Sequence, residues 1–186
     1  NVTLDVTANG TSLITNGFGP GVNPMSYALS TSRAIPAYDE RGDLSFYQRR
    51  ATYKYNGNVE SLGYNIINER DNTGSQVRNF TLSTSLDFKW EIISGVTYQF
   101  TGGYNRYTKN NEVYALDRSY YVTQNYRGYD FGTKGIADAE YKAATLTDGG
   151  TLYTNEITQA SYNVQNKLLY SKTFNTDHRI NAMVGM

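Results

Sequence analysis

The feature that most constrains the fold of this chain is an unbroken alternation of side chains over residues 80–90. Even-numbered positions carry Phe80, Leu82, Thr84, Leu86, Phe88 and Trp90, and odd-numbered positions carry Thr81, Ser83, Ser85, Asp87 and Lys89. Because successive side chains of a strand point to opposite faces, the pattern predicts a β-strand with one apolar and one polar face. Its length matches the roughly 9–11 residues that a tilted strand needs to cross a bilayer, and aromatic residues stand at both ends.

Four further segments share this alternation. The sequence predicts strands at about residues 1–7, 96–105, 161–173 and 179–186 in addition to 80–90. Asn166 and Leu169 interrupt the alternation of their segment, and a β-bulge near Asn166 would explain both. Since both ends of the sequence have strand character, we expect it to be a segment of a larger barrel domain.

The two faces of these strands carry different side chains. Because the side chains alternate with a period of two, we expect one set to face lipid and the other to face the lumen of a barrel. A shift of one residue in the strand register would exchange the two faces completely. The predicted lipid-facing residues are Leu82, Leu86, Tyr98, Phe100, Val164 and Leu168, and the predicted lumen-facing residues are Ser83, Asp87, Gln99, Thr101 and Gln165.

The connections alternate in length. Short turns at about 91–95 and 174–177 alternate with long polar stretches at about 8–78 and 106–158. Outer-membrane barrels have this asymmetry, with short periplasmic turns and long extracellular loops. A compact soluble domain seldom has an unstructured loop longer than about 12–15 residues. The sequence therefore predicts an all-β fold: an antiparallel transmembrane β-barrel segment of about five strands with two long extracellular loops.

Local signals divide the first long loop. Asn23-Pro24 predicts one or two helical turns over 25–31, and a second helical turn is expected at 65–69. Glu40–Gly42 predicts a turn, and residues 44–55 could add a short strand pair.

Composition provides little support for catalysis or for nucleic-acid binding. Lys plus Arg and Asp plus Glu both number 17, so no net basic charge indicates a nucleic-acid partner. The chain has no Cys and a single His, which argues against a zinc site. Asp138 and Glu140 would share one face of a strand, but a solvated loop explains them better than an acid/base pair. Asp39, Glu40 and Asp43 likewise fit a solvated turn better than a Ca²⁺ loop. We expect no enzyme activity, metal or cofactor.

Several segments together resemble one transporter family. They are Asn23-Pro24, Arg33 to Gly42 with its Pro-Ala-Tyr-Asp-Glu-Arg-Gly run, Tyr64 to Glu69, Phe80 to Tyr104, and His178 to Gly185. On these residues the chain resembles the SusC/RagA-type TonB-dependent outer-membrane transporters of Bacteroidetes, as a barrel fragment lacking the plug. The resemblance implies a barrel of about 22 strands in the bacterial outer membrane. It also implies import of glycan or peptide cargo, a SusD-like surface lipoprotein as a lid, and coupling to the TonB complex through the plug region.

The second long loop is rich in tyrosine. Aromatic rings stack on sugars and peptide side chains and also anchor protein partners. We expect contacts to cargo or to the lid from Tyr120, Tyr121, Tyr126, Tyr129, Arg118, Arg127 and, in the first loop, Tyr38. The alternative is that these tyrosines pack the loop in place of a core. A soluble all-β carbohydrate-binding module and a passive porin or adhesin barrel also remain open.

Overall fold

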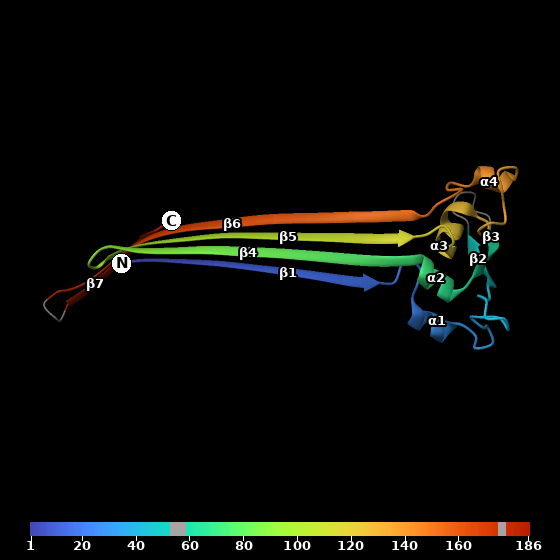
Figure 1. Ribbon diagram of the computed structural model, residues 1–186, viewed down its shortest axis with the longest axis horizontal. Coiled ribbons are helices and arrows are strands. Elements are labelled where there is room, and N and C mark those ends of the chain that lie inside the picture. The colour runs from blue at the N-terminus through green and yellow to red at the C-terminus, as the bar shows by residue number, and fades with distance from the viewer. Residues whose placement is uncertain (53–58, 175–177) are drawn as a thin grey trace. The chain divides into compact units, whose positions relative to one another are not determined.

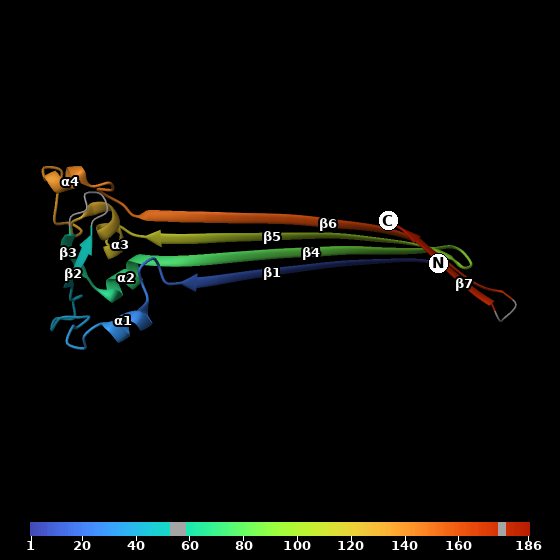
Figure 2. The same cartoon turned by 180° about the vertical axis from the view of Figure 1, so that it is seen from behind.

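The computed structural model describes residues 1–52, 59–174 and 178–186. Strands make up 57% and helices 16% of the described structure, which confirms the all-β class. Five strands form one mainly antiparallel sheet in the order β1-β4-β5-β6-β7 (Figure 1). The strands β1, β4, β5 and β6 follow one another in this order from behind as well (Figure 2). In the described residues the sheet is open, with β1 and β7 as its edges.

The strands of this sheet are mostly longer than the sequence predicted. Their bounds are β1 Val2–Gly17, β4 Thr73–Ile93, β5 Val96–Ala115, β6 Thr151–Phe174 and β7 His178–Gly185. The predicted loops 8–78 and 106–158 are wrong at their ends, because residues 18–72 and 116–150 connect these strands. The added strand residues are largely polar on both faces, so their periodic apolar signal is lost. Paired backbone groups nevertheless extend the strands.

The turn between β4 and β5 is short. Gly95 has φ of 85° and ends the two-residue turn between β4 and β5. A side chain at Gly95 would bring its Cβ within 2.6 Å of the Ser171 carbonyl oxygen, so glycine is required there for two reasons. Residues 175–177 of the other predicted turn lie outside the described residues.

The predicted bulge near Asn166 is wrong on the side that faces β7. Strands β6 and β7 pair without interruption from Lys167 with Gly185 to Phe174 with His178. Asn166 continues this ladder, since its N–H donates to the Met186 carbonyl at 2.9 Å and its carbonyl accepts from Met186 at 3.0 Å. The amide side chain of Asn166 accepts a hydrogen bond from the Tyr98 hydroxyl at 2.6 Å. A polar side chain therefore interrupts the apolar face without a shift of register relative to β7.

Side-chain contacts keep the two faces of the sheet separate. Phe88 and Tyr98 pack edge to face with ring centres 6.3 Å apart. On the opposite face the Thr101 hydroxyl donates to Asp87 at 2.8 Å. These contacts place residues of like character on the same face, as the period of two predicted.

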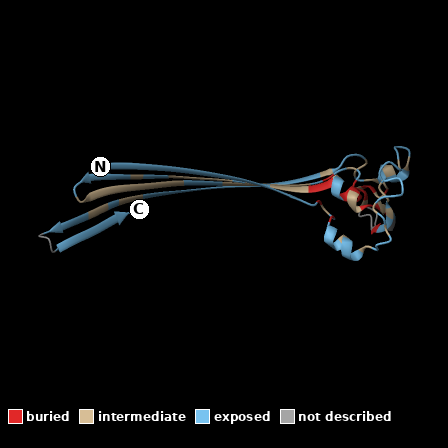
Figure 3. Cartoon of the chain, turned by 60° about the horizontal axis from the view of Figure 1, so that its bottom comes forward, coloured by how far each residue is buried: buried red, intermediate tan, exposed pale blue. Residues whose placement is uncertain are grey.

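The chain divides into two compact units. We call Asn1–Ile14, Arg78–Asn110 and Glu156–Met186 the sheet unit, and Thr15–Val77 with Asn111–Asn155 the loop unit. Every buried residue of the described chain lies in the loop unit (Figure 3). The described residues of the sheet unit are all half-buried or exposed.

The loop unit contains the short elements. They are α1 Pro24–Ser30, β2 Tyr47–Thr52, β3 Val59–Tyr64, α2 Ile66–Asn72, α3 Tyr120–Val122, the π-helix η1 Thr123–Arg127 and α4 Ala139–Ala143. Helices are present at both predicted positions, because the Asn23 and Asn65 side chains accept hydrogen bonds from backbone N–H groups of the first turn. The strand pair predicted within 44–55 is partly wrong: β2 lies in that range, but its antiparallel partner β3 lies beyond it. Residues 53–55 of the range lie outside the described residues. No described helix has the length and apolar character needed to cross a membrane.

Buried polar side chains hold the segments of the loop unit together. Asn65 donates to the carbonyls of Ala37 and Ser45, both at 2.8 Å, which ties the segment before β2 to α2. Asn68 donates to the Arg118 carbonyl at 2.9 Å and so links α2 to the second long loop. The apolar part of this core is small and consists of Ala51, Leu62, Tyr64 and Tyr120, with Tyr27, Tyr47 and Ile66 packed against it.

Candidate functional site

A groove lined by tyrosines is the candidate binding site of the loop unit. It encloses about 550 Å³ and is lined by Pro20, Val113, Tyr114, Tyr121, Tyr126, Thr151, Leu152 and Tyr153. The rings of Tyr121 and Tyr126 lie 6.4 Å apart at an angle of 58°. Four aromatic rings beside aliphatic side chains can stack on sugar rings or on the side chains of a peptide.

The short helix that carries Tyr121 is held in place at its first turn. The hydroxyl oxygen of Ser119 accepts from the Val122 N–H at 3.2 Å and caps α3. The carboxylate of Glu69, on α2, accepts from the N–H groups of Tyr120 and Tyr121. Because these donors belong to a different segment from Glu69, the carboxylate fixes one side of the groove against α2.

Glu69 is itself an unusual carboxylate. It is only 2% exposed, and burial raises its pKa above the ordinary value, although the hydrogen bonds from Tyr120, Tyr121 and Asn68 act in the opposite direction. Desolvation is the largest of these effects, since a charge in a buried site loses its hydration. No pattern in the sequence distinguishes Glu69 from an exposed glutamate.

The seven predicted contact residues do not form one site. Tyr121 and Tyr126 line the groove, whereas Tyr120, Arg127 and Tyr129 are 8%, 2% and 6% exposed. For the two tyrosines, the alternative in which they pack the loop agrees with their burial. Tyr129 stacks on Tyr141 with ring centres 6.3 Å apart.

Arg127 organises the second long loop from within. Its guanidinium donates to three backbone carbonyls, those of Asp117, Leu146 and Gly149. The Gly149 contact is 2.9 Å and the Leu146 contact 3.3 Å. A planar guanidinium can satisfy several carbonyls at once, so one buried side chain closes the loop over residues 116–150.

The remaining two predicted residues lie elsewhere in the loop unit. Arg118 lies with its guanidinium carbon 5.1 Å from the ring centre of Phe131, and both line a second hollow of about 450 Å³. Asp130 lines that hollow too, and its carboxylate accepts from the Gly63 N–H at 2.9 Å. Tyr38 is exposed and forms an isolated β-bridge with Leu44.

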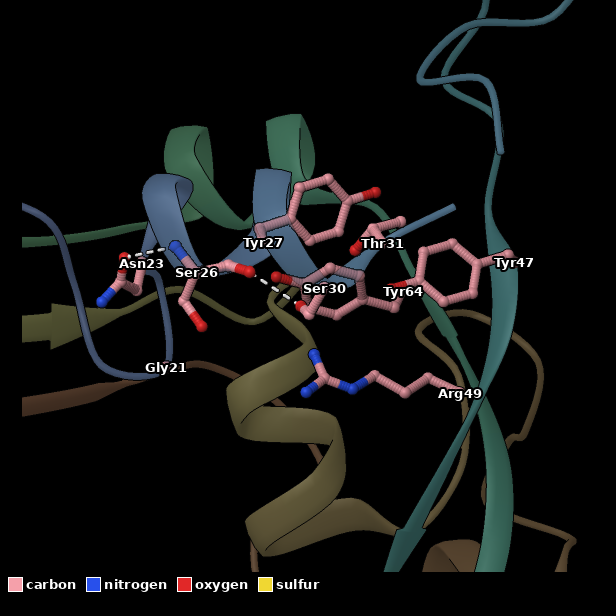
Figure 4. A pocket seen from close by; sticks show the side chains of 9 residues that line it. All are labelled: Gly21, Asn23, Ser26, Tyr27, Ser30, Thr31, Tyr47, Arg49 and Tyr64. Atoms are coloured by element: carbon pink, nitrogen blue, oxygen red, sulfur yellow. Dashed lines mark hydrogen bonds between the residues drawn. The ribbon is translucent and has the colours of Figure 1, made fainter. Parts of the chain in front are cut away.

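A third hollow went unrecognised in the sequence. Tyr27, Tyr47, Tyr64 and Arg49 line it together with hydroxyl and amide side chains (Figure 4). Burial raises the pKa of Tyr64 to about 12, so its hydroxyl stays protonated at neutral pH. The pairing of Tyr47 with Tyr64 across β2 and β3 was the signal that could have revealed this hollow. The sequence could not bring these two rings together, because the strand pair predicted within 44–55 does not include Tyr64.

The acidic residues considered at the sequence level have local structural partners. Asp138 and Glu140 do not share a strand face, because Asp138 precedes α4 and Glu140 lies in its first turn. Asp39 accepts from the N–H groups of Arg41 and Asp43, which confirms a turn around the predicted residues. Within the described ranges, no group of three or more His, Cys, Asp or Glu side chains could hold a metal ion.

Comparison with known proteins identifies no family for this chain. No protein-family model matches the chain, and no curated protein matches it. The arrangement itself can provide aromatic stacking and hydrogen bonding.

Proposed function

We propose that this chain is part of a transmembrane β-barrel of the bacterial outer membrane that imports oligosaccharides or peptides, as the SusC/RagA-type transporters that it resembles do. The observation that supports this proposal is the exposed apolar face of the sheet unit. Leu86, Leu168 and Val184 on this face are 37%, 41% and 67% exposed. A large apolar surface is unfavourable in water, and this one extends over five strands. In our proposal the lipid of the membrane shields it from water.

Strand length and the open edges agree with this proposal. The strands β1, β4, β5 and β6 have 16, 21, 20 and 24 residues, whereas strands of globular proteins average about 5–6 residues. The edges β1 and β7 would pair with further strands, since a barrel in lipid must close to satisfy its backbone groups. A TonB complex and a SusD-like lipoprotein are the partners that the resemblance adds.

Cysteine scanning tests the membrane part of the proposal. A lipid-confined thiol reagent should label cysteines that replace Leu86, Val164 and Leu168 in the intact protein. It should not label cysteines that replace Asp87 or Gln165. Equal labelling of both sets would contradict the assignment, and the reverse pattern would require the opposite orientation of the sheet.

In this proposal the tyrosine groove contacts the cargo. Tyr121 and Tyr126 are half-buried and line the groove, so their rings combine a fixed position with an accessible surface. Two rigid rings give contact area at a small loss of side-chain entropy. The groove therefore provides a better candidate contact than the buried tyrosines at 120 and 129.

Uptake measurements test this role. The double variant Tyr121→Ala/Tyr126→Ala should reduce uptake of a labelled oligosaccharide or peptide by about tenfold, since stacking on each ring contributes about 0.5–1.5 kcal/mol. The matched control is Tyr162→Ala, which removes an exposed tyrosine of the sheet unit outside the groove and outside the predicted contacts. An equal loss of uptake in both variants would mean that the groove has no specific role in contacting the cargo. Uptake that persists without the proton-motive force would indicate a passive porin.

A further inference from the structure

The third hollow of the loop unit combines a cation with aromatic rings. It encloses about 320 Å³ between α1 and the β2–β3 pair. Figure 4 shows the Arg49 side chain reaching from β2 beneath the rings of Tyr27 and Tyr64. Hydroxyl groups of Ser26 and Ser30 line the side formed by α1. The hollow is separate from the tyrosine groove, with which it shares no lining residue.

Aromatic rings hold the guanidinium of Arg49 in position. Its central carbon lies 4.7 Å from the ring centre of Tyr64 and 5.6 Å from that of Tyr120. A guanidinium over a ring face is attracted to the ring electrons and keeps its N–H groups available in its own plane. Tyr64 and Tyr120 are both buried, so the support under the cation is rigid.

The charge of Arg49 is not neutralised by an ion pair in the described structure. Among the residues whose side chains the structure describes, which leave out 52–60 and 175–177, no carboxylate forms a salt bridge with it. Glu69 acts on it electrostatically, but the Glu69 carboxylate already accepts from the N–H groups of Tyr120 and Tyr121. The in-plane donors of Arg49 therefore remain available to a ligand in the hollow.

The hydroxyls of Tyr47 and Tyr64 beside this cation are neutral at physiological pH. Burial raises the pKa of both Tyr47 and Tyr64. Tyr27, Tyr47 and Tyr64 contact one another, with ring centres 5.9 Å apart for Tyr27 and Tyr64 and 5.6 Å apart for Tyr47 and Tyr64. The lining thus offers hydrogen-bond donors and one positive charge to an incoming group.

We propose that this hollow binds the carboxylate of a small acidic solute through Arg49, with the solute lying against the tyrosine rings. A planar guanidinium matches a carboxylate with two parallel hydrogen bonds, which a neutral sugar or peptide amide cannot form. The carboxylate could belong to a uronic acid or to the C-terminus of a peptide. The inference rests on the proposed import function because it names a ligand class for it.

Binding to the purified intact protein in detergent tests this inference separately from uptake. The sugar probes are trigalacturonate and its methyl ester, and the peptide probes are trialanine and its C-terminal amide. We expect one acid to bind at least about tenfold more tightly than its neutral derivative, because charge-assisted hydrogen bonds are about twice as strong as neutral ones. The pair that shows this preference identifies the source of the carboxylate. No preference in either pair overturns the inference, even if uptake occurs.

Two variants assign the preference to Arg49. Arg49→Gln should weaken binding of the preferred acid about tenfold and leave its neutral derivative unchanged. The control Arg50→Gln removes the neighbouring exposed arginine, whose side chain points to the other face of β2, and should change binding less than twofold. An equal loss in both variants overturns the inference. If Arg49→Gln does not fold, the same comparison is made with Arg49→Lys, which keeps the charge and loses the paired hydrogen bonds.

Discussion

The two units of this chain differ in how far their apolar side chains are buried. In the sheet unit no described residue is buried, and large apolar side chains such as Val164 and Val184 are 59% and 67% exposed. In the loop unit a small core is closed by tyrosines and by buried polar groups such as Glu69 and Arg127. The comparison shows that the loop unit supplies its own interior, whereas the apolar face of the sheet unit stays exposed in the described residues.

The core of the loop unit should be the most sensitive to substitution. Tyr64→Ala should destabilise it by about 3–5 kcal/mol, as is usual for a buried aromatic side chain, because Tyr64 is 3% exposed and contacts three other tyrosine rings. Tyr162→Ala, at an 83% exposed position of the sheet unit, should change stability by less than about 0.5 kcal/mol. Hydrogen exchange of residues 18–72 in the detergent-solubilised protein measures both effects. Equal effects would remove the distinction between the units.

The sheet unit should be sensitive to charge on one face only. Leu168→Arg should destabilise the protein in lipid by about 2–4 kcal/mol, and Gln165→Arg by less than about 1 kcal/mol, because only the first would place a charge in hydrocarbon. Reversible folding into lipid vesicles measures this difference. If Gln165→Arg is the more harmful, the lipid-facing and lumen-facing assignments must be exchanged.

Glu69 should give the loop unit a pH dependence. Because burial raises its pKa in the folded state, the folded protein binds this proton more tightly than the unfolded chain does. Stability should therefore increase as pH falls from neutral through the raised pKa and level off below the unfolded value. The slope cannot exceed about 1.4 kcal/mol per pH unit for one proton.

The control for this pH dependence is a neutral substitution. Glu69→Gln should remove this component, whereas Glu40→Gln, at an exposed turn position, should keep it. Urea unfolding of the loop unit, followed by hydrogen exchange between pH 4 and pH 8, compares the variants. If the slope survives in Glu69→Gln, other groups are responsible for it.

The units also differ in how well the sequence predicts them. In the sheet unit a period of two predicts strands near 80–90 and 96–105, because neighbouring side chains report the face directly. The ends of those strands were missed, since residues such as Lys109 and Asn110 are polar on both faces. Strand pairing there depends on backbone partners from distant parts of the chain, which no local pattern encodes.

The candidate site could be predicted only in part. Tyrosine density located Tyr121 and Tyr126 in the groove, but it could not separate them from Tyr120, which faces the core. Tyr120 and Tyr121 differ in accessibility because Glu69, from another segment, accepts hydrogen bonds from their N–H groups and so fixes the orientation of α3 at its start. Such long-range hydrogen bonds determine which rings remain accessible, and the sequence alone gives no measure of them.

Asn166 offers the finest test of the contrast between the two units. Its side chain lies on the apolar face of the sheet and accepts from the Tyr98 hydroxyl at 2.6 Å. If lipid covers this face, neither group can turn to water, yet measured hydrogen bonds in membranes average only about 0.6 kcal/mol. A double-mutant cycle with Tyr98→Phe and Asn166→Leu, measured by folding into lipid vesicles, should therefore give a coupling of about that size. A coupling of zero would mean that water reaches both side chains, and the apolar face would then not be covered at this depth.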